Sequence, residues 1–484
     1  MRICVLTPTE QFRNDILDVV RVFEGSGAEA VSEEEDGAAL LRHTEEICGD
    51  IRRVRVEFLA EGKRFESARE GKTQSGPLED KRVHKRLIKQ SVYDVCVSFY
   101  GRRPPWGSLT GIRPTRLVYM AMDGGLTPEE AAEEMRRQFD VSAEKTALTL
   151  ETVRTQLSLP RQQPGEIDIY VGIPFCVSRC AYCSFLSGEV GKGGQLRPYT
   201  DALKREIEGA VKLIREFRLT PRAFYMGGGT PTSLPGDLFE EVLEALRPLT
   251  DPCRERTVEA GRPDTLDKQK LAAMKNSAVG RISINPQTSH DATLKLIGRR
   301  HTAADTVRAY RMARDMGFED INMDLIAALP GETAEMFRET LLWSREMRPE
   351  SLTVHTLCIK HSSLLHLWEA KLPDGDMAAQ MVADGRREAE ERGMRPYYLY
   401  RQKYMAGNLE NVGYALPGME SLYNVGMMEE TADVLALGAG AISKRVNTHT
   451  GKILRAPNVS DIGHYIARTD EMLERKKTLL LSEI

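Results

Sequence analysis

The sequence predicts an α/β protein with a mostly parallel sheet in the middle of the chain. Between Ile167 and about residue 360, short apolar segments alternate with segments of helical periodicity, which is typical of βα units. Apolar residues make up 41% of the chain, enough for a sizeable core. Over roughly 190 residues the pattern fits either an open doubly wound sheet or a barrel-like sheet, and periodicity alone does not separate them.

The expected elements of this core follow one another in a regular order. The strands read IDIYVGIPF, RAFYMGGGT, RTVEAG, GRISINPQ, DINMDLIAAL and SLTVHTLCI. The helices between them begin near Tyr199, Pro235, Asp267, His290, Ala303 and Glu332. Because the carboxyl ends of parallel strands meet at one edge of a sheet, we expect a functional site at that edge.

Two further regions flank the core. Residues 1–165 contain a strand that leads into a helix, then an alternating pair, RRVRVEFLAEGKRFESA, typical of a hairpin around a Glu-Gly turn. The polar stretch ESAREGKTQSGPLEDKRVHK is expected to be a mobile connection, and Ser158 to Gly165 a linker. We therefore predict an α+β and helical N-terminal extension over 1–165, the core over 166–360, and a mixed C-terminal domain over 361–484.

Composition narrows the classes of function. The formal net charge of −4 gives no global attraction to nucleic acid. No apolar run approaches the ~20 residues of a membrane-spanning helix, and the first residues, MRICVLTPTEQFRND, lack the apolar region of a signal peptide. We expect a cytoplasmic protein, with reduced thiols, that neither binds nucleic acid nor spans a membrane.

Three of the eight cysteines lie within eight residues, after the first strand of the core. Cys176, Cys180 and Cys183 form a C-x3-C-x2-C pattern. A structural zinc site would need a fourth ligand, and the next candidates, Cys253 and His290, are distant. A thioredoxin-like redox pair would use Cys180 and Cys183 and leave Cys176 over. A four-iron cluster explains the number three, because three thiolates hold three irons and leave the fourth open.

Other polar residues and glycines also follow the ends of strands. GGGTPT follows the second strand, and its glycines would let a ligand approach bare backbone groups. Glu259 ends the third strand, Gln287 ends the fourth, and Asp324 lies within the fifth. Their arrangement at one edge of the predicted sheet favours a site over a random scatter of polar residues.

The cysteine pattern with Tyr182 before its last member, together with GGGTPT, resembles the radical S-adenosylmethionine (SAM) superfamily. More closely, YVGIPFCVSRCAYCSF, GGGTPTSL, RISINPQT, IGRRHT and NMDLIAALPGET resemble the oxygen-independent coproporphyrinogen III oxidase family. The motif WGSLTGIRPTRL, from Trp106 to Leu117, and YYLYRQKYMAGNLENVGYA are similar to the coproporphyrinogen dehydrogenase HemZ branch. The resemblance covers nearly the whole chain and implies a partial (β/α)6 TIM-like barrel of radical SAM type.

The resemblance also implies two cofactors, a [4Fe-4S] cluster and SAM, and assigns residues to them. The cluster would be held by Cys176, Cys180 and Cys183. An acid suits the SAM ammonium, an arginine its carboxylate, and carboxylates or amides its ribose hydroxyls. The matching catalytic and SAM-binding positions are Tyr170, Tyr182, Gly228, Gly229, Thr230, Glu259, Gln287, Arg299 and Asp324.

The implied reaction is the oxygen-independent decarboxylation of coproporphyrinogen III to protoporphyrinogen IX through a 5′-deoxyadenosyl radical. A flavodoxin or ferredoxin would supply the electron, and the C-terminal domain would cover the substrate. Arg401, Lys403 and Lys360 are candidate partners of the substrate carboxylates or else solvated charges. A tetrapyrrole pocket or ordinary packing would equally explain the aromatic residues Tyr397, Tyr398, Tyr400 and Tyr404.

Two positions depart from the oxidase pattern. Gly172 stands where the family has a histidine, and Phe185 where it has a fourth cysteine. Two alternatives therefore stay open: a haem-binding chaperone on the same scaffold, and a radical SAM methyltransferase acting on another aromatic substrate. The chaperone branch carries a His-Asn pair in its C-terminal part, whereas SLYNVGMM here keeps Asn424 without the histidine.

Overall fold

The computed structural model describes residues 1–24, 28–31, 37–111, 113–183, 188–190, 194–359, 363–367, 373–402, 405–448 and 450–484. The chain splits into two compact units. The first comprises Met1–Val153 with Arg401–Glu410, and the second comprises Arg154–Tyr400 with Asn411–Ile484. The three-domain division expected from the sequence remains a prediction.

The first unit contains a five-stranded sheet with the order β2-β1-β3-β4-β5. β1 is parallel to β2 and β3, whereas β4 is antiparallel to β3 and β5. Its core includes Phe12, Val54, Phe58 and Val92, all nearly inaccessible to solvent. The strands are β1 (Arg2–Leu6), β2 (Glu29–Val31), β3 (Ala39–Cys48), β4 (Ile51–Ala60) and β5 (Lys63–Lys72). The helices that begin in this part of the chain are α1 (Arg13–Glu24), α2 (Pro77–Tyr100), α3 (Pro114–Asp123), α4 (Pro128–Phe139) and α5 (Ala143–Ser158).

Two expectations for this region have different outcomes. The predicted hairpin is confirmed: β4 and β5 pair around Glu61 and Gly62, whose φ angles of 52° and 71° suit a tight hairpin turn. The predicted mobile connection is wrong, because its residues belong to β5 and to the first turns of α2. The alternation of charged and small residues in β5 is that of a strand with little burial, which resembles a loop in composition.

The second unit contains an eleven-stranded sheet whose middle confirms the predicted βα core. Its order is β14-β15-β13-β12-β11-β10-β9-β6-β16-β17-β18, an open order among the described residues. The six strands of the core are all parallel and lie side by side in chain order. They are β6 (Glu166–Ile173), β9 (Thr220–Gly228), β10 (Glu255–Glu259), β11 (Arg281–Ser283), β12 (Asp320–Ala327) and β13 (Ser351–Thr356).

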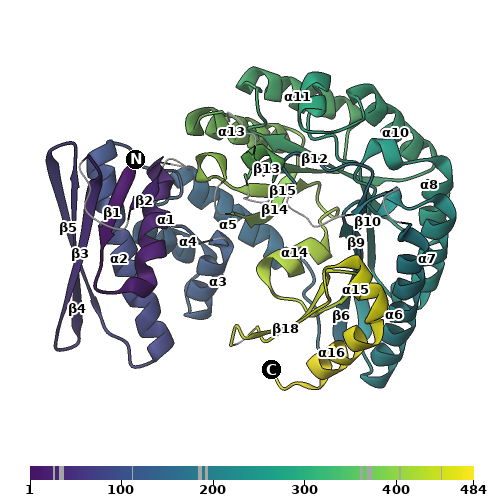
Figure 1. Ribbon diagram of the computed structural model, residues 1–484, viewed down its shortest axis with the longest axis horizontal. Coiled ribbons are helices and arrows are strands. Elements are labelled where there is room, and N and C mark those ends of the chain that lie inside the picture. Colours follow the sequence, from purple (N-terminus) through teal and green to yellow (C-terminus); the bar gives the residue numbers. More distant parts are fainter. Residues whose placement is uncertain are drawn as a thin grey trace. The chain divides into compact units, whose positions relative to one another are not determined.

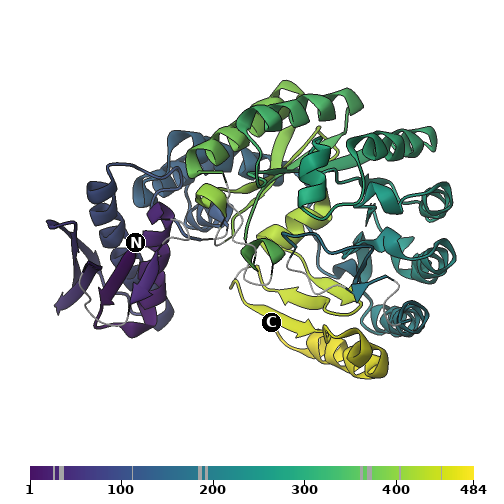
Figure 2. The ribbon, with the colours of Figure 1, turned by 45° about the horizontal axis from the view of Figure 1, so that its top comes forward.

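Helices connect these strands and lie along the outer face of the sheet, as both ribbon views show (Figures 1 and 2). α10 begins with a capping box, in which Thr302 Oγ1 accepts from Asp305 N at 3.2 Å and the Asp305 carboxylate accepts from Thr302 N at 2.8 Å. The helices are α6 (Leu196–Glu216), α7 (Gly236–Thr250), α8 (Lys268–Asn276), α9 (Asp291–Leu296), α10 (Ala303–Asp315) and α11 (Ala334–Met347).

The rest of the chain extends both edges of this sheet. β16 pairs parallel with β6 and is followed by antiparallel β17 and β18, while β15 pairs antiparallel with β13 and β14. The strands are β14 (Arg395–Tyr400), β15 (Asn411–Ala415), β16 (Val434–Leu437), β17 (Ile442–Val446) and β18 (Ile453–Pro457), with the short pair β7 (Phe175–Cys176) and β8 (Gly188–Glu189). The helices are α12 (Leu364–Leu367), α13 (Gly375–Glu391), α14 (Leu422–Glu429), α15 (Ile462–Ala467) and α16 (Thr469–Leu481).

The amino ends of the core strands are closed by charged residues and by α14. Arg222 Nε and Nη2 donate to the two carboxylate oxygens of Asp168 at 2.8 and 2.7 Å, and both side chains are buried. Glu255 accepts from Leu422 N at 2.5 Å, at the start of α14. The helix therefore lies at the edge of the sheet opposite the strand ends that the cysteines and the glycine motif follow.

A buried ion pair ties the end of β16 to the outer helices. Lys476 Nζ lies 2.7 Å from Glu206 Oε1, and neither side chain is exposed. The Glu206 carboxylate also accepts from Gly438 N at 2.8 Å, Asn458 Nδ2 at 2.8 Å and Tyr465 Oη at 2.5 Å. Such a pair holds its partners firmly because either charge alone would be strongly disfavoured.

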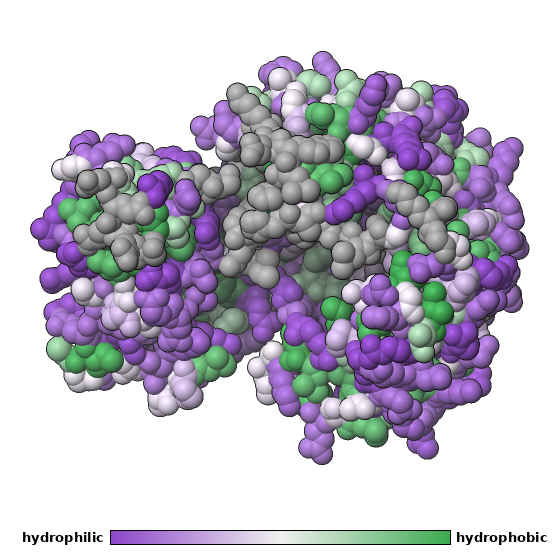
Figure 3. Space-filling view, in the orientation of Figure 1, coloured by the Kyte–Doolittle hydropathy of each residue, from purple (hydrophilic) through white to green (hydrophobic). Residues whose placement is uncertain are grey.

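None of the helices in the described part of the chain is long and apolar enough to cross a membrane. On the face shown in Figure 3, hydrophilic side chains cover most of the surface, and apolar side chains form small scattered patches. Such patches are ordinary on a folded protein.

We expect Lys476→Met to lower the free energy of unfolding by about 3–5 kcal/mol, because Glu206 would stay buried without its counter-charge. Urea unfolding followed by circular dichroism measures the change. Lys477→Met is the matched control: Lys477 pairs with Glu216 at 2.9 Å, but 40% and 50% of the two side chains are exposed, so little change is expected. Equal losses in the two variants would contradict this account.

Candidate functional site

The three cysteines follow β6 at the carboxyl edge of the sheet. All are half-buried, and none takes part in a disulfide. Within the segment, Cys183 N donates to Cys180 O at 3.1 Å. Ala181 N donates to Ile297 O at 2.9 Å, and Ala181 O accepts from Leu365 N at 2.9 Å. The cysteine loop, residues 174–183, is thus held from both sides by backbone hydrogen bonds.

The glycine motif after β9 lies directly against this loop. Gly229 N donates to Ile173 O at 2.8 Å, and Thr230 N donates to Phe175 O at 2.7 Å. Cys176 Sγ lies 3.5 Å from Thr230 Oγ1. A Cβ on Gly229 would meet Phe175 O at 2.5 Å, so a larger residue would push the two segments apart. The structure therefore brings together the two motifs that the sequence analysis placed at one edge.

Glu259 ends β10 and lies beside the glycine motif. Burial raises its pKa to about 7, and the nearby Asp324 charge adds to that increase. Tyr225 Oη donates to Glu259 Oε1 at 2.5 Å and partly offsets both effects. A Cβ on Gly227 would lie 2.9 Å from the carboxylate, which shows how closely the motif approaches it. This carboxylate is poised to change its protonation state near neutral pH.

Asp324 faces the same interior from β12. Although burial alone would raise its pKa, the adjacent His355 and a hydrogen bond from Asn322 hold the pKa of Asp324 below its ordinary value. Asn322 Nδ2 donates to Asp324 Oδ1 at 2.7 Å, and His355 Nε2 lies 3.7 Å from Asp324 Oδ2. Glu259 and Asp324 are thus two carboxylates in one region with pKa values shifted in opposite directions.

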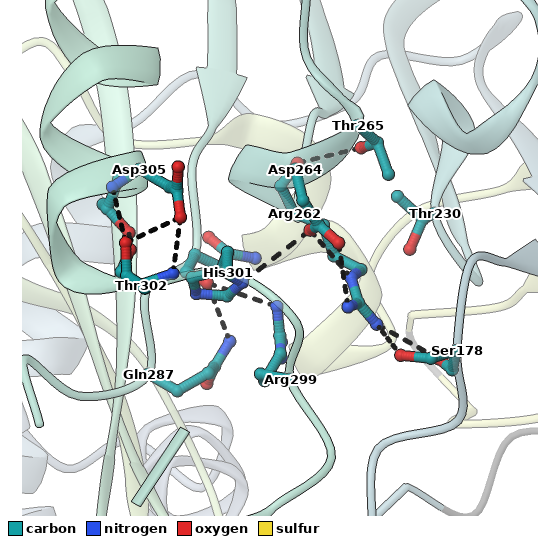
Figure 4. Close-up of polar contacts among 12 residues, drawn as sticks. Ser178, Thr230, Arg262, Asp264, Thr265, Gln287, Arg299, His301, Thr302 and Asp305 are labelled. Atoms are coloured by element: carbon teal, nitrogen blue, oxygen red, sulfur yellow. Dashed lines mark hydrogen bonds and ion pairs between the residues drawn. The ribbon is translucent and has the colours of Figure 1, made fainter. Parts of the chain in front are cut away.

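Arg299 and Gln287 complete this edge (Figure 4). Arg299 Nη2 donates to Tyr182 Oη at 3.0 Å, which links the arginine to the cysteine loop. Gln287 is buried and has a φ of 73°, a strained conformation for a residue other than glycine. Its backbone bridges β12, with Gln287 N donating to Asp324 O at 3.0 Å. Strain of this kind is common at ligand sites and fits the proposed role.

Tyr170 lies deeper within the sheet than the cysteine loop. Its ring stacks 6.1 Å from that of Tyr423 on α14, and Tyr423 stacks 4.6 Å from Tyr225. Tyr225 is the tyrosine that donates to Glu259. Tyr170 therefore contributes to an aromatic layer beneath Glu259, whereas Tyr182 lies in the cysteine loop itself.

The residues considered for substrate binding have other partners where they are described. Arg401 is buried in the first unit, where it donates to Leu109 O at 2.6 Å and Asn408 O at 2.9 Å and lies over the Trp106 ring. Its interpretation as a solvated charge is therefore wrong, and a role in substrate binding stays a prediction. Lys360, Lys403, Tyr404 and Phe185 lie outside the described residues.

The aromatic residues on β14 pack within the second unit. Arg281 Nη2 donates to Tyr397 Oη at 3.3 Å, and Tyr398 Oη lies 3.1 Å from Thr353 Oγ1. Tyr400 is half-buried, and its ring stacks 6.3 Å from that of Tyr398. Packing within the unit therefore explains the positions of Tyr397 and Tyr398, while the side chain of Tyr400 stays partly accessible to solvent.

Several residues at this edge were not predicted from the sequence. Asn285 lies two residues before Gln287, and His355 lies two residues beyond Thr353. Alternating positions of an extended chain share one face, so a period-2 pattern could have identified both residues. Arg262, which contacts the cysteine loop, lies in an irregular turn after β10, where no periodicity could identify it.

The residues present fit a cluster and a polar ligand. Arg299 Nε and Asn285 Oδ1 are buried without hydrogen-bond partners, and such atoms are rare unless a ligand or water satisfies them. In the described part of the chain, no three His, Cys, Asp or Glu side chains are arranged to hold a single metal ion. A four-iron cluster does not require that arrangement, because each thiolate binds a different iron.

Comparison with known proteins agrees with this geometry. Residues 170–344 match the family model described as the radical SAM superfamily. The chain is 41% identical over 402 residues to the oxygen-independent coproporphyrinogen-III oxidase-like protein HemZ of Bacillus subtilis (strain 168), covering 81% of this chain and 80% of that protein. It is 29% identical to the heme chaperone HemW of the same organism, over 61% of this chain and 74% of that protein.

Among solved structures, the chain is similar to coproporphyrinogen III oxidase (HemN) from Escherichia coli, described as a radical SAM enzyme. The TM-score is 0.52 at 21% identity, with 69% of this chain and 74% of that chain covered. The chain belongs to the radical SAM superfamily and has its fold, and its cofactors are a [4Fe-4S] cluster and SAM. Within the superfamily it belongs to the oxygen-independent coproporphyrinogen III oxidase family, on the HemZ branch.

We expect Gly229→Ala to lower the affinity for SAM about tenfold or more, because the new methyl group must displace the cysteine loop backbone. Equilibrium dialysis with labelled SAM under anaerobic conditions measures the affinity, and an iron assay reports on the cluster. Gly280→Ala is the control, since nothing lies within 4 Å of its added Cβ. Unchanged binding in Gly229→Ala would show that SAM binding does not require this close approach of the motif to the cysteine loop.

Proposed function

We propose that this protein catalyses the oxygen-independent oxidative decarboxylation of coproporphyrinogen III, converting two propionate side chains to the vinyl groups of protoporphyrinogen IX. The observation that carries the proposal is the 41% identity to a coproporphyrinogen-III oxidase-like protein over four-fifths of both chains. The contact between the cysteine loop and the glycine motif supports the cofactor part of it.

The cofactors supply the hydrogen-abstracting 5′-deoxyadenosyl radical when they are bound, and the electron comes from a flavodoxin or ferredoxin. Abstraction of one hydrogen atom leaves a carbon radical on the propionate; the bond to the carboxylate then breaks, CO2 leaves, one electron passes to a one-electron acceptor, and a vinyl group remains. Cys176, Cys180 and Cys183 hold the cluster, and the glycine motif exposes backbone groups to SAM. The protein's part is to position the reactants and exclude water.

The remaining site residues bind SAM by charge and hydrogen bonding. Glu259 pairs with the ammonium, and Arg299 with the carboxylate. Gln287 and Asp324 bind the ribose hydroxyls, and the hydrogen bond from Asn322 keeps Asp324 ionised and oriented. The unpartnered Arg299 Nε supports this assignment, because a bound carboxylate would satisfy it.

A second candidate is a haem-binding chaperone, favoured by the 29% identity to HemW. Against it, Asn424 lies on α14 without the histidine that accompanies it in the chaperone branch. That helix is at the amino edge of the sheet, where Leu422 N donates to Glu255. The oxidase proposal therefore stands first.

The product formed from coproporphyrinogen III tests the proposal. Reconstituted protein is incubated anaerobically with SAM, dithionite and coproporphyrinogen III, and the oxidised tetrapyrroles are separated by chromatography. Protoporphyrin is the expected product. A methylated product would indicate a methyltransferase, and 5′-deoxyadenosine with an unchanged tetrapyrrole would contradict the substrate assignment. Haem binding without decarboxylation would favour the chaperone.

Cys176→Ala should lose both cluster iron and product, because three thiolates are needed to hold the cluster. Cys253→Ala is the matched control: this cysteine is buried in the turn between α7 and β10 and donates to Leu249 O at 3.3 Å. Iron and product are expected to persist in it. Full iron content in Cys176→Ala would overturn the assignment of the cluster ligands.

The affinity for SAM should rise about tenfold between pH 6 and pH 8. The carboxylate of Glu259 must be ionised to pair with an ammonium, and burial raises its pKa to about 7. It is therefore mostly protonated below that value and mostly ionised above it. Calorimetric titration at several pH values measures the profile. Glu259→Gln should bind weakly at every pH, and a flat profile in the unmodified protein would refute the pairing.

A further inference from the structure

Arg262 reaches the cysteine loop from the turn that follows β10 (Figure 4). It is only 3% exposed. Its Nη1 atom donates to Ser178 O at 3.1 Å and to Ser178 Oγ at 2.9 Å, and lies 4.0 Å from Cys180 Sγ. Ser178 Oγ in turn donates to Gly298 O at 3.1 Å. One guanidinium edge thus contacts the segment between two of the three cysteines.

The other edge of the guanidinium is fixed by Asp264. Nε and Nη2 donate to the two carboxylate oxygens at 3.2 and 3.1 Å, a fork-to-fork contact that determines the plane of the group. The turn itself is locked, because Arg262 O accepts from Thr265 N at 3.0 Å and from Thr265 Oγ1 at 2.8 Å. His301, whose side chain is fully buried, lies behind Asp264, with Nδ1 3.7 Å from Oδ1. The cation is therefore held in one orientation, toward the loop.

We propose that Arg262, oriented by Asp264, is a positioning residue that holds the cysteine loop and raises the reduction potential of the cluster. Reduction adds negative charge to the cluster and its thiolates. A fixed cation near a thiolate stabilises that charge, and charge and hydrogen bonding around the sulfurs set the potential. The proposal rests on the assignment of the three cysteines to the cluster.

Asp264 provides the opposite charge, so the two residues predict opposite shifts. Removing the cation leaves an uncompensated carboxylate near the cluster and disfavours reduction. Removing the carboxylate charge leaves the cation in place and favours reduction. A role confined to holding the loop would alter cluster content or stability in both variants, without shifts of opposite sign.

The test is a redox titration of the reconstituted protein followed by electron paramagnetic resonance, without SAM or tetrapyrrole, together with an iron assay. In Arg262→Gln the ratio of reduced to oxidised cluster at a fixed potential should fall about tenfold or more, which is a midpoint shift of about −59 mV or beyond for one electron. In Asp264→Asn the midpoint should move in the positive direction. Arg262→Lys keeps the charge without the fork, so its midpoint should lie nearer to that of the unmodified protein.

Arg222→Gln is the matched control, since Arg222 forms the same buried fork with Asp168 at the amino ends of the strands. Its midpoint should not move, although its stability should fall. An unchanged midpoint in Arg262→Gln, or an equal shift in Arg222→Gln, would overturn the proposal. If Arg262→Gln does not fold, Asp264→Asn decides: a positive midpoint shift supports the proposal, and a negative or absent shift overturns it. Because no tetrapyrrole is present, a failure here is distinct from a failure of the proposed decarboxylation.

Discussion

The backbone pairing between the cysteine loop and the glycine motif is the contact on which the site depends. Two hydrogen bonds, from Gly229 N to Ile173 O and from Thr230 N to Phe175 O, join the ends of β6 and β9. They bring Cys176 Sγ within 3.5 Å of Thr230 Oγ1. No side chain fits at Gly229, so the approach requires glycine there. The neighbouring carboxylate of Glu259 then comes into reach of the same edge.

The two edges of the parallel sheet differ in how their buried arginines are paired. At the amino ends, Arg222 and Asp168 satisfy one another, and Arg281 pairs with Asp320 at 3.2 Å. At the carboxyl ends, Arg299 Nε and Asn285 Oδ1 stay without partners. Carboxylates pair with the buried arginines of the first edge, whereas at the second edge the unpartnered Arg299 Nε and Asn285 Oδ1 favour a bound ligand.

The sequence predicted the fold well where periodicity carries the information. The six parallel strands and the hairpin around Glu61 and Gly62 follow directly from apolar spacing and turn residues. The second half of β5 was missed because charged residues occupy a strand with almost no buried face, and burial of one face is what makes a strand recognisable. The C-terminal domain was expected to cover the substrate, yet within it the N-terminus of α14 binds Glu255 at the amino edge, a long-range contact that no local pattern encodes.

The same distinction applies to the site. Short motifs identified the cysteines, the glycines and the residues at strand ends, because each has a local reason to lie there. Arg262 and Asp264 have no such signal, since their role arises only when a turn after β10 meets the loop after β6. Arg401 misled for the opposite reason: its charge suggested a solvated surface, but it is buried in the first unit and donates to backbone carbonyls there.

The central claim is that three cysteines hold the cluster and that SAM takes its fourth iron. Mössbauer spectroscopy of protein reconstituted with isotopically enriched iron tests this most directly, with spectra recorded before and after SAM is added. The account predicts that the signal of one iron in four changes on addition of SAM while the other three keep theirs. A spectrum in which no iron responds to bound SAM would contradict it.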